Sequence, residues 1–224
     1  MIKNITNLGD AAIYCDFGSE VNKELNSKVI KYFRNLKQKK IKGITNLAPS
    51  YNKLIITFDL EIISYQELRD KILNLKLDKF NEIISKKIKV PVCLDEEFAL
   101  DIIQVSEKTS LNFEDIYKNI LNIDFYCYMT GFIAGMPFLG DLSEKMRAQR
   151  LETPRVKVPK GSVGLTEQFT NIYTFESPGG WNIIGNTPLE IFDSSKIDSP
   201  NLISPGDTII FKQISLKDYK NYNE

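Results

Sequence analysis

Apolar residues in the first part of the chain follow a two-residue period that is interrupted twice by a helical period. Val21–Leu36 places apolar residues at three- and four-residue steps, which predicts a helix with Ser19 as its N-cap. Ser64 and Glu67 form a capping-box pattern that starts a second helix, and a further strand is predicted over residues 83–92. The order of these helices and strands along the chain predicts a two-layer α/β sandwich. Its other four strands are predicted by apolar–polar alternation over residues 2–6, 11–17, 41–47 and 53–58.

The pattern changes in the second part of the chain. Residues 95–122 predict two short helices, the second capped by Asn112 with Asp115 three residues further on. After Phe125, short β-type runs alternate with Gly/Pro turns about every 8–12 residues, which is typical of a β-barrel or sandwich. These runs are Val156–Val158, Ile172–Phe175, Trp181–Ile184, Leu189–Phe192 and Thr208–Phe211.

Composition narrows the possible chemistry. The 224 residues carry 29 Lys and Arg, 29 Asp and Glu and no histidine. Zero net charge disfavours a general nucleic-acid binder, because neutralising phosphates requires an excess of cations. The lack of histidine excludes a Ser-His-Asp triad, a Cys-His dyad and an imidazole proton shuttle within this chain. The first 90 residues have 17 basic against 10 acidic side chains, and the remainder has 12 against 19.

The cysteines and the N-terminus point to a cytoplasmic protein. Cys15, Cys93 and Cys127 are odd in number and widely spaced, which favours buried free thiols over a disulfide framework or a zinc site. The first seven residues lack a continuous apolar run of the kind found in signal peptides. No run approaches the roughly 18 apolar residues needed to span a membrane, so no membrane contact is expected.

Two segments are candidates for chemistry. Residues 131–140, GFIAGMPFLG, place three glycines and a proline among apolar side chains, so they form either a tight apolar turn or a loop whose N–H groups face a ligand. A cationic run follows, which is either a pocket for a small anion or a solvated edge strand protected by charge. Its members are Lys145, Arg147, Arg150, Arg155, Lys157 and Lys160.

Two further observations concern turns and nucleotide motifs. Ser177–Trp181, SPGGW, predicts a sharp turn that ends on the only tryptophan, which either anchors the core or stacks on a ligand. Pro205–Asp207 predicts another turn, before the last strand. Neither a Walker A loop nor a GxGxxG fingerprint occurs, so a nucleotide role requires another kind of pocket or a partner subunit.

Four ordered motifs resemble one protein family, that of the B subunit of 5-oxoprolinase, also called allophanate hydrolase subunit 1 or sporulation-kinase inhibitor. The family patterns are GFxPGFxYLG, TPRxxVPxGSVG, sPGGWxxIGxTP and PGDxVxF. They correspond here to residues 131–140, 153–164, 177–188 and 205–211. Residues 8–10 and 43–51 also resemble the family, so the likeness covers nearly the whole chain.

The resemblance implies an α+β fold, with a small N-terminal α/β domain over residues 1–88 and a cyclophilin-like β-barrel over residues 89–224. It also implies that the chain works with a second barrel subunit, and with a possible third subunit, in an enzyme that opens the cyclic amide 5-oxoproline to glutamate with ATP. We expect Arg150, Arg155 and Lys157 to be catalytic and to hold anionic groups. The expected substrate contacts are Gly131, Phe132, Gly135, Pro137, Ser162 and Tyr173.

Several positions depart from the family pattern. Ile120 stands where the family usually has histidine, Ala134 replaces a motif proline, and Phe169 replaces a motif glutamine. Gln168 and Thr174 replace a motif glycine and a motif proline. These changes leave two alternatives open: a regulatory protein that binds a histidine kinase, and a carboxyltransferase-like module for urea or allophanate. The second alternative requires a biotin-carrying partner, because this chain has no Met-Lys-Met motif.

Overall fold

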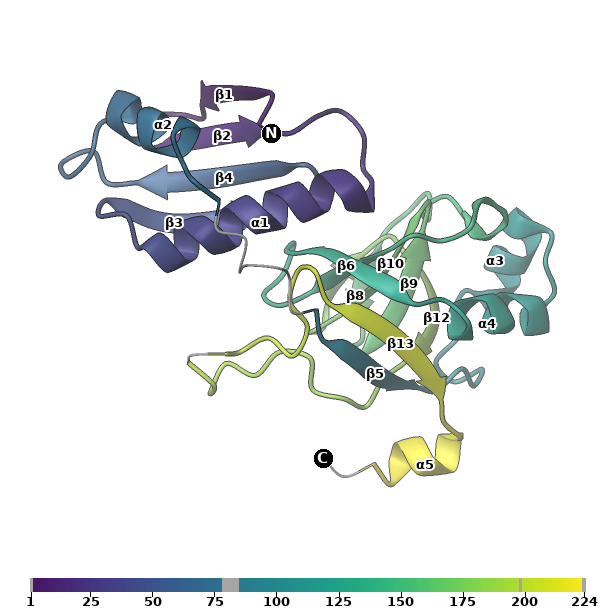
Figure 1. The fold of residues 1–224 in the computed structure, drawn as a ribbon. Coiled ribbons are helices and arrows are strands. Elements are labelled where there is room, and N and C mark those ends of the chain that lie inside the picture. Colours follow the sequence, from purple (N-terminus) through teal and green to yellow (C-terminus); the bar gives the residue numbers. More distant parts are fainter. Residues whose placement is uncertain (1, 78–84, 198, 223–224) are drawn as a thin grey trace. The chain divides into compact units, whose positions relative to one another are not determined.

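The protein is described by a computed structural model that covers residues 2–77, 85–197 and 199–222. The chain divides into two compact units, Met1–Ser85 (unit 1) and Lys86–Glu224 (unit 2). Figure 1 shows both units as ribbons. No helix within the described residues is long and apolar enough to cross a membrane.

Unit 1 is a two-layer α/β sandwich, as predicted. Its antiparallel sheet has the order β1-β2-β4-β3. Alternation along β2 and β4 buries one face of the sheet, and α1 and α2 pack on that face through Val29, Leu36, Leu68 and Ile72. The elements are β1 Asn4–Asn7, β2 Ala12–Asp16, α1 Lys23–Lys39, β3 Ile44–Pro49, β4 Lys53–Phe58 and α2 Tyr65–Leu73.

The two helices of unit 1 test the capping predictions. The Ser64–Glu67 capping box is present, with both reciprocal hydrogen bonds, so this prediction is confirmed. The prediction of Ser19 as the first cap is wrong. Asn22 occupies that position, and its side-chain oxygen accepts from the Leu25 N–H at 2.9 Å. Both residue types are good caps, so local sequence does not separate them.

Unit 2 contains a curled sheet of seven strands in the order β12-β9-β10-β7-β6-β13-β5. A separate two-stranded ribbon joins β11 to β8. The strands are β5 Lys87–Val92, β6 Phe125–Thr130, β7 Pro137–Gly140, β8 Arg155–Val158, β9 Ser162–Thr166, β10 Phe169–Ile172, β11 Ser177–Gly179, β12 Asn182–Asn186 and β13 Thr208–Gln213. The helical segments among its described residues are α3 Ile102–Thr109, α4 Phe113–Leu121, the 3-10 turn η1 Glu144–Met146 and α5 Leu216–Lys220.

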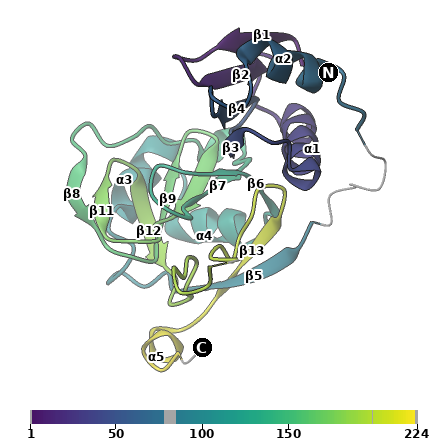
Figure 2. The ribbon, with the colours of Figure 1, turned by 90° about the vertical axis from the view of Figure 1, so that its left-hand side faces the viewer.

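Strand β5 corrects the predicted order. The sequence places this strand at the end of the N-terminal sandwich, but it pairs in parallel with β13 along its whole length. Figure 2 shows β5 and β13 side by side in unit 2. Residues 83 and 84 of the predicted strand lie outside the described residues. A pairing between segments so far apart in the chain leaves no local pattern.

A single bridge closes the curled sheet of unit 2. Cys93, just after β5, pairs with Asn186 of β12 through two backbone hydrogen bonds of 2.8 and 3.0 Å. The two edge strands therefore meet at one end. Gly185 permits this contact, because a Cβ there would lie 2.7 Å from the Cys93 carbonyl oxygen. The predicted fold class, an α/β sandwich followed by a barrel-type sheet, is confirmed.

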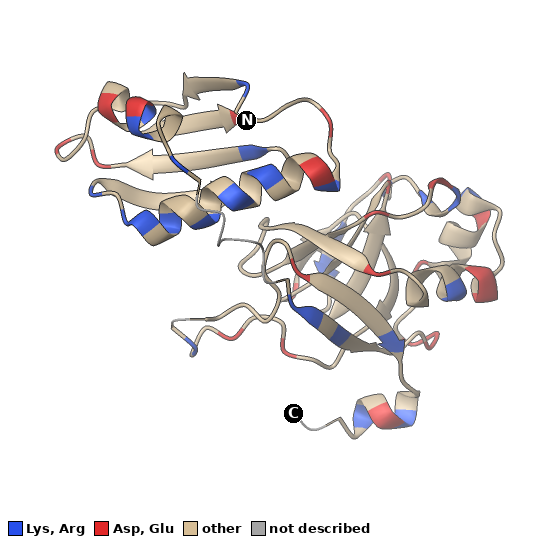
Figure 3. Cartoon of the chain, in the orientation of Figure 1, with Lys and Arg blue, Asp and Glu red and all other residues tan. Residues whose placement is uncertain are grey.

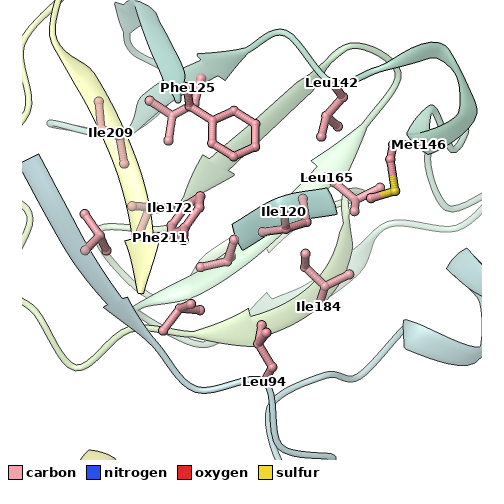
Figure 4. Packing of buried hydrophobic residues seen from close by; sticks show 14 of the residues in the cluster. Leu94, Ile120, Phe125, Leu142, Met146, Leu165, Ile172, Ile184, Ile209 and Phe211 are labelled. Atoms are coloured by element: carbon pink, nitrogen blue, oxygen red, sulfur yellow. The ribbon is translucent and has the colours of Figure 1, made fainter. Parts of the chain in front are cut away.

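The core of unit 2 fills the inside of this sheet. Figure 4 shows Ile120 of α4 among Leu165, Ile184 and Phe211, which come from three different strands. Asn112 caps α4 by accepting from the Asp115 N–H at 2.8 Å, as predicted. The inner face is therefore occupied by packed apolar side chains, and polar chemistry belongs to the other face and the rim.

Two predicted strands of unit 2 are wrong in detail. The strand predicted over Ile172–Phe175 lies earlier, at Phe169–Ile172, because the two-residue turn after Thr166 folds β10 directly back onto β9. Leu189–Phe192 forms no strand. Only Phe192 pairs there, in an isolated bridge with Asn201. Pro188 precedes this segment, and a proline cannot donate to a ladder.

Candidate functional site

A buried ion pair lies at one end of the sheet in unit 2. Arg155, the first residue of β8, donates from Nη1 and Nη2 to the two oxygens of Asp101, at 2.7 and 2.5 Å. The Asp101 side chain is fully buried, whereas 28% of the Arg155 side chain is exposed. Asp101 also accepts from the Ile183 N–H at 2.7 Å. This pair therefore ties β8 and β12 to the start of α3.

A second cation and a buried hydroxyl lie beside the SPGGW turn. The backbone of Gly179 passes the Tyr173 hydroxyl so closely that a Cβ at this position would overlap with it. A Cβ on Gly180 would lie 3.1 Å from Nη2 of Arg150. The two glycines thus make room for the tyrosine hydroxyl and the guanidinium. Two features hold the two glycines in place. Gly179 is part of strand β11, and the Gly180 carbonyl accepts a hydrogen bond from the Leu151 N–H.

Electrostatics link these groups. Burial raises the pKa of Tyr173, while the positive charges of Arg150 and Arg155 act in the opposite direction, so both guanidinium groups influence the same hydroxyl. The structure thus brings together three of the residues that the sequence predicted. No ion pair of Arg150 is found among the described residues, whereas Arg155 is neutralised by Asp101. Arg150 is exposed and is therefore open to an external anion.

An open cleft of about 580 Å³ adjoins the ion pair. Residues of α3 form one wall, the 151–153 segment forms the other, and Arg155 takes part in the lining. Lys108 in the α3 wall donates to the Gln149 carbonyl and to Oδ1 of Asn182, both at 3.0 Å. Both acceptors are neutral groups, so they bring no negative charge to the ammonium. Glu107 and Glu152 supply negative charge in the same cleft.

Residues 131–136 of the glycine-rich segment form the connection between β6 and β7, as predicted for a turn or loop, whereas the prediction is wrong for residues 137–140, which form β7 inside the sheet. Phe132 is 70% exposed and has a φ of 71°, and Gly135 also has a φ of 71°. The ring of Phe192 packs so closely under Gly135 that no Cβ would fit there. Thr174 donates from its hydroxyl to the Ala134 carbonyl at 2.6 Å. Ala134 and Thr174 both depart from the family pattern, and their hydrogen bond holds the loop.

The remaining predicted residues have different surroundings. Lys157 forms an exposed pair with Glu176 at 2.9 Å. Ser162 is buried at the start of β9, where its backbone pairs with Tyr173 and Asn186. Pro137 is buried at the start of β7, and Gly131 closes the loop through a hydrogen bond to Met136. Within the contacts described, Ser162 joins Tyr173 only through the backbone, and the other three residues join neither Arg150 nor Tyr173.

The other departures from the family pattern are absorbed by packing. Ile120 is fully buried in the apolar core, where a titratable side chain would be desolvated. The Phe169 ring packs edge-on against Tyr128 at 5.5 Å. Tyr128 donates to Asp141 at 2.8 Å, and Gln168 donates to the other oxygen of the same carboxylate at 3.2 Å.

Sequence reasoning missed two residues of this site. Asp101 precedes α3 and looks like an N-cap, yet its side chain makes no capping bond. Lys108 looks like an ordinary cation in the last turn of the same helix. No local signal distinguishes either residue, because each acts on groups from distant strands. No cluster of three or more metal-binding side chains occurs in the described parts of the chain.

Comparison with known proteins identifies the family. The family model "Carboxyltransferase domain, subdomain C and D" matches residues 3–203. The chain belongs to this family. The B subunit of 5-oxoprolinase from Bacillus subtilis (strain 168) is 30% identical over 234 residues, which cover 98% of this chain and 96% of that protein. The predicted resemblance is therefore confirmed.

Two other proteins that this chain resembles are longer. The crystal structure of TTHA0988 matches with a TM-score of 0.82 and 26% identity, covering 91% of this chain and 40% of that one. The urea amidolyase of Saccharomyces cerevisiae (strain ATCC 204508 / S288c) is 22% identical over 249 residues, 96% of this chain but 13% of that protein. In these relatives the matching region is thus one part of a larger chain.

Proposed function

We propose that this chain is a subunit of an ATP-dependent 5-oxoprolinase and acts together with a second barrel subunit. Similarity to the B subunit of the Bacillus subtilis 5-oxoprolinase over nearly the full length of both chains supports this assignment. The observation that carries the proposed site is the space left by two successive glycines of the SPGGW turn, Gly179 for the Tyr173 hydroxyl and Gly180 for the Arg150 guanidinium. The two groups suit a ligand that carries negative charge and hydrogen-bond acceptors.

The chemistry gives Arg150 a specific task. A cyclic amide is a poor electrophile, and phosphorylation of its oxygen turns that oxygen into a good leaving group. A positive charge at the site where negative charge develops lowers the barrier of such a step. Arg150 is the proposed holder of this charge, and Tyr173 is a proposed hydrogen-bonding contact. ATP enters as the co-substrate of the complex, and the proposal assigns no residue of this chain to its adenine or ribose.

The other predicted residues receive different proposed roles. Arg155 is engaged with Asp101, so we assign it to positioning β8 and the turn beside Arg150, not to direct binding. Lys157 supplies charge at the exposed rim. The loop residues Gly131, Phe132, Gly135 and Pro137, together with Ser162, remain proposed substrate contacts, with Phe132 the most exposed of them.

The test is 5-oxoproline-dependent ATP hydrolysis by the chain mixed with candidate partner subunits, with each component omitted in turn. We expect activity to require this chain. In the complete complex, Arg150→Ala should lower kcat/KM by at least 100-fold, and Arg150→Lys should recover part of the loss. Arg147→Ala removes an exposed cation three residues away and is the matched control, with unchanged activity expected.

Two outcomes would count against the proposal. Activity that persists without this chain would overturn the subunit assignment. Equal activity of Arg150→Ala and Arg147→Ala in a folded complex would remove Arg150 from the site while leaving the subunit assignment standing.

A second candidate is a carboxyltransferase-type module. It is favoured by the match to urea amidolyase over 96% of this chain. It predicts carboxyl transfer from a biotin-carrying partner in place of ATP hydrolysis driven by 5-oxoproline. A mixture with such a partner that consumes urea, and no response to 5-oxoproline, would favour it.

A further inference from the structure

A groove in unit 1 runs between an edge strand and a helix. Strand β3 is the last strand in the order β1-β2-β4-β3, so one side of it has no partner strand among the described residues. A groove of about 520 Å³ lies along β3 and the C-terminal half of α1. This volume is in the range of about 300–1,000 Å³ that is usual for ligand sites. An edge strand beside a helix is the geometry in which some domains bind extended peptides as an added strand.

The floor and the rim of the groove differ in character. Apolar side chains line the floor: Phe33, Leu36, Ile41, Ile44 and Leu47. Three exposed lysines lie in the lining, Lys37 and Lys40 at the end of α1 and Lys42 just before β3. No carboxylate lines this groove within the described residues, and none forms an ion pair with these lysines there.

The surroundings extend the positive charge. Figure 3 marks the Lys and Arg positions of the ribbon in blue, and blue segments recur along α1. The adjoining groove shares Lys40 and Lys42 and adds Lys39 and Lys71. Its two carboxylates are Glu61 and Glu67, and the latter is held in the capping box of α2. The C-terminal end of a helix attracts cations, which accounts for some of these lysines but not for Lys42, which lies beyond the helix.

We propose that the β3 edge of unit 1 binds an extended, acidic segment of a partner protein as an added strand. The six residues of β3 span about 20 Å, at roughly 3.3 Å per residue, so about six residues of the partner pair with it. Alternate side chains of that segment point into the apolar floor, and its carboxylates meet Lys37, Lys40 and Lys42. Pro49 ends the strand and limits the register, because it has no N–H to donate.

The probe is a fluorescein-labelled octapeptide that alternates glutamate and valine, titrated with the full chain at low salt and followed by fluorescence anisotropy. We expect saturable binding that weakens with added salt, as Debye screening requires. The double variant Lys37→Glu/Lys42→Glu should bind at least 10-fold more weakly. The matched control Lys145→Glu/Lys212→Glu changes two exposed lysines of unit 2 and should bind like the parent chain.

A second probe separates strand addition from charge attraction alone. The same octapeptide with alternate backbone amides N-methylated keeps every charge but cannot pair as a strand. We expect its binding to be lost, and we expect the unmodified peptide to slow hydrogen exchange in residues 44–49. Equal binding of both peptides, equal binding to both double variants, or no binding of the octapeptide would each overturn the proposal. Neither probe depends on 5-oxoproline or ATP, so the outcome is separate from that of the proposed function.

Discussion

Replacement of Arg155 by methionine removes the guanidinium that pairs with a carboxylate inaccessible to water. Asp101 then keeps one hydrogen bond, from the Ile183 N–H at 2.7 Å, and loses the two from Arg155. Breaking a buried ion pair from one side costs about 3–5 kcal/mol. The Arg155 side chain is 28% exposed, so water screens part of the interaction, and we expect a loss near the lower limit, about 3 kcal/mol.

Further substitution of Asp101 separates buried charge from lost packing. In the Arg155→Met background, Asp101→Asn keeps an oxygen to accept from the Ile183 N–H but removes the buried charge. We therefore expect the double variant to recover about 1–2 kcal/mol relative to Arg155→Met. Lys157→Met, two residues further along β8, breaks an exposed ion pair and should change stability by less than about 0.5 kcal/mol.

The assay is urea unfolding followed by the fluorescence of Trp181, the only tryptophan, which directly precedes the Asn182–Ile183 part of β12. The signal thus reports on unit 2, where the ion pair lies. An Arg155→Met variant within about 1 kcal/mol of the parent chain, or a double variant no more stable than Arg155→Met, would refute the reasoning.

Three further outcomes follow from the structure. Gly185→Ala should cost about 2–4 kcal/mol in the same assay, because its Cβ meets the Cys93 carbonyl oxygen at 2.7 Å and opens the bridge; an unchanged midpoint would contradict this. A thiol-reactive dye at pH 8 should label no cysteine until urea is added, because burial raises the pKa of all three thiols, that of Cys15 to about 12; rapid labelling of the folded chain would be inconsistent with the structure. A hydrogen bond from Lys53 lowers the pKa of Asp16 in the folded state, so its stabilising effect is present above about pH 4 and is lost as the pH falls through the lowered pKa. Asp16→Asn should therefore make the acid unfolding of unit 1, followed by circular dichroism, shallower, and an identical pH profile would exclude the contribution.

Local signals in the sequence predicted the elements that depend on neighbouring residues. The capping box at Ser64, the N-cap at Asn112 and the strands β2 and β4 follow from patterns of a few residues, and they are present as predicted. The position of β5 could not be predicted in this way, since its partner β13 lies more than 100 residues further along the chain. The first cap was misplaced because Ser19 and Asn22 are both suitable caps.

The candidate site shows the same division. The sequence shows Arg150 and Arg155 as members of a cationic run, but it does not reveal that Asp101 pairs with Arg155. The sequence predicts the glycines of the SPGGW turn only as turn residues. The structure shows that they also leave room for the Tyr173 hydroxyl and the Arg150 guanidinium. The partners of a polar group are set by tertiary packing, which residue type and local spacing do not encode.

The parallel pairing of β5 with β13 also orders events during synthesis of the chain. Unit 1 can complete its sheet early, but about 115 residues separate β5 from β13, and their synthesis takes roughly 6–23 s at usual elongation rates. During that interval the strand has no partner on its β13 side. Before β13 is made, strand β5 is protected against pairing with other nascent chains by two charged residues and a proline, Lys87, Lys89 and Pro91. The same three residues are compatible with the finished fold, where β5 is an edge strand.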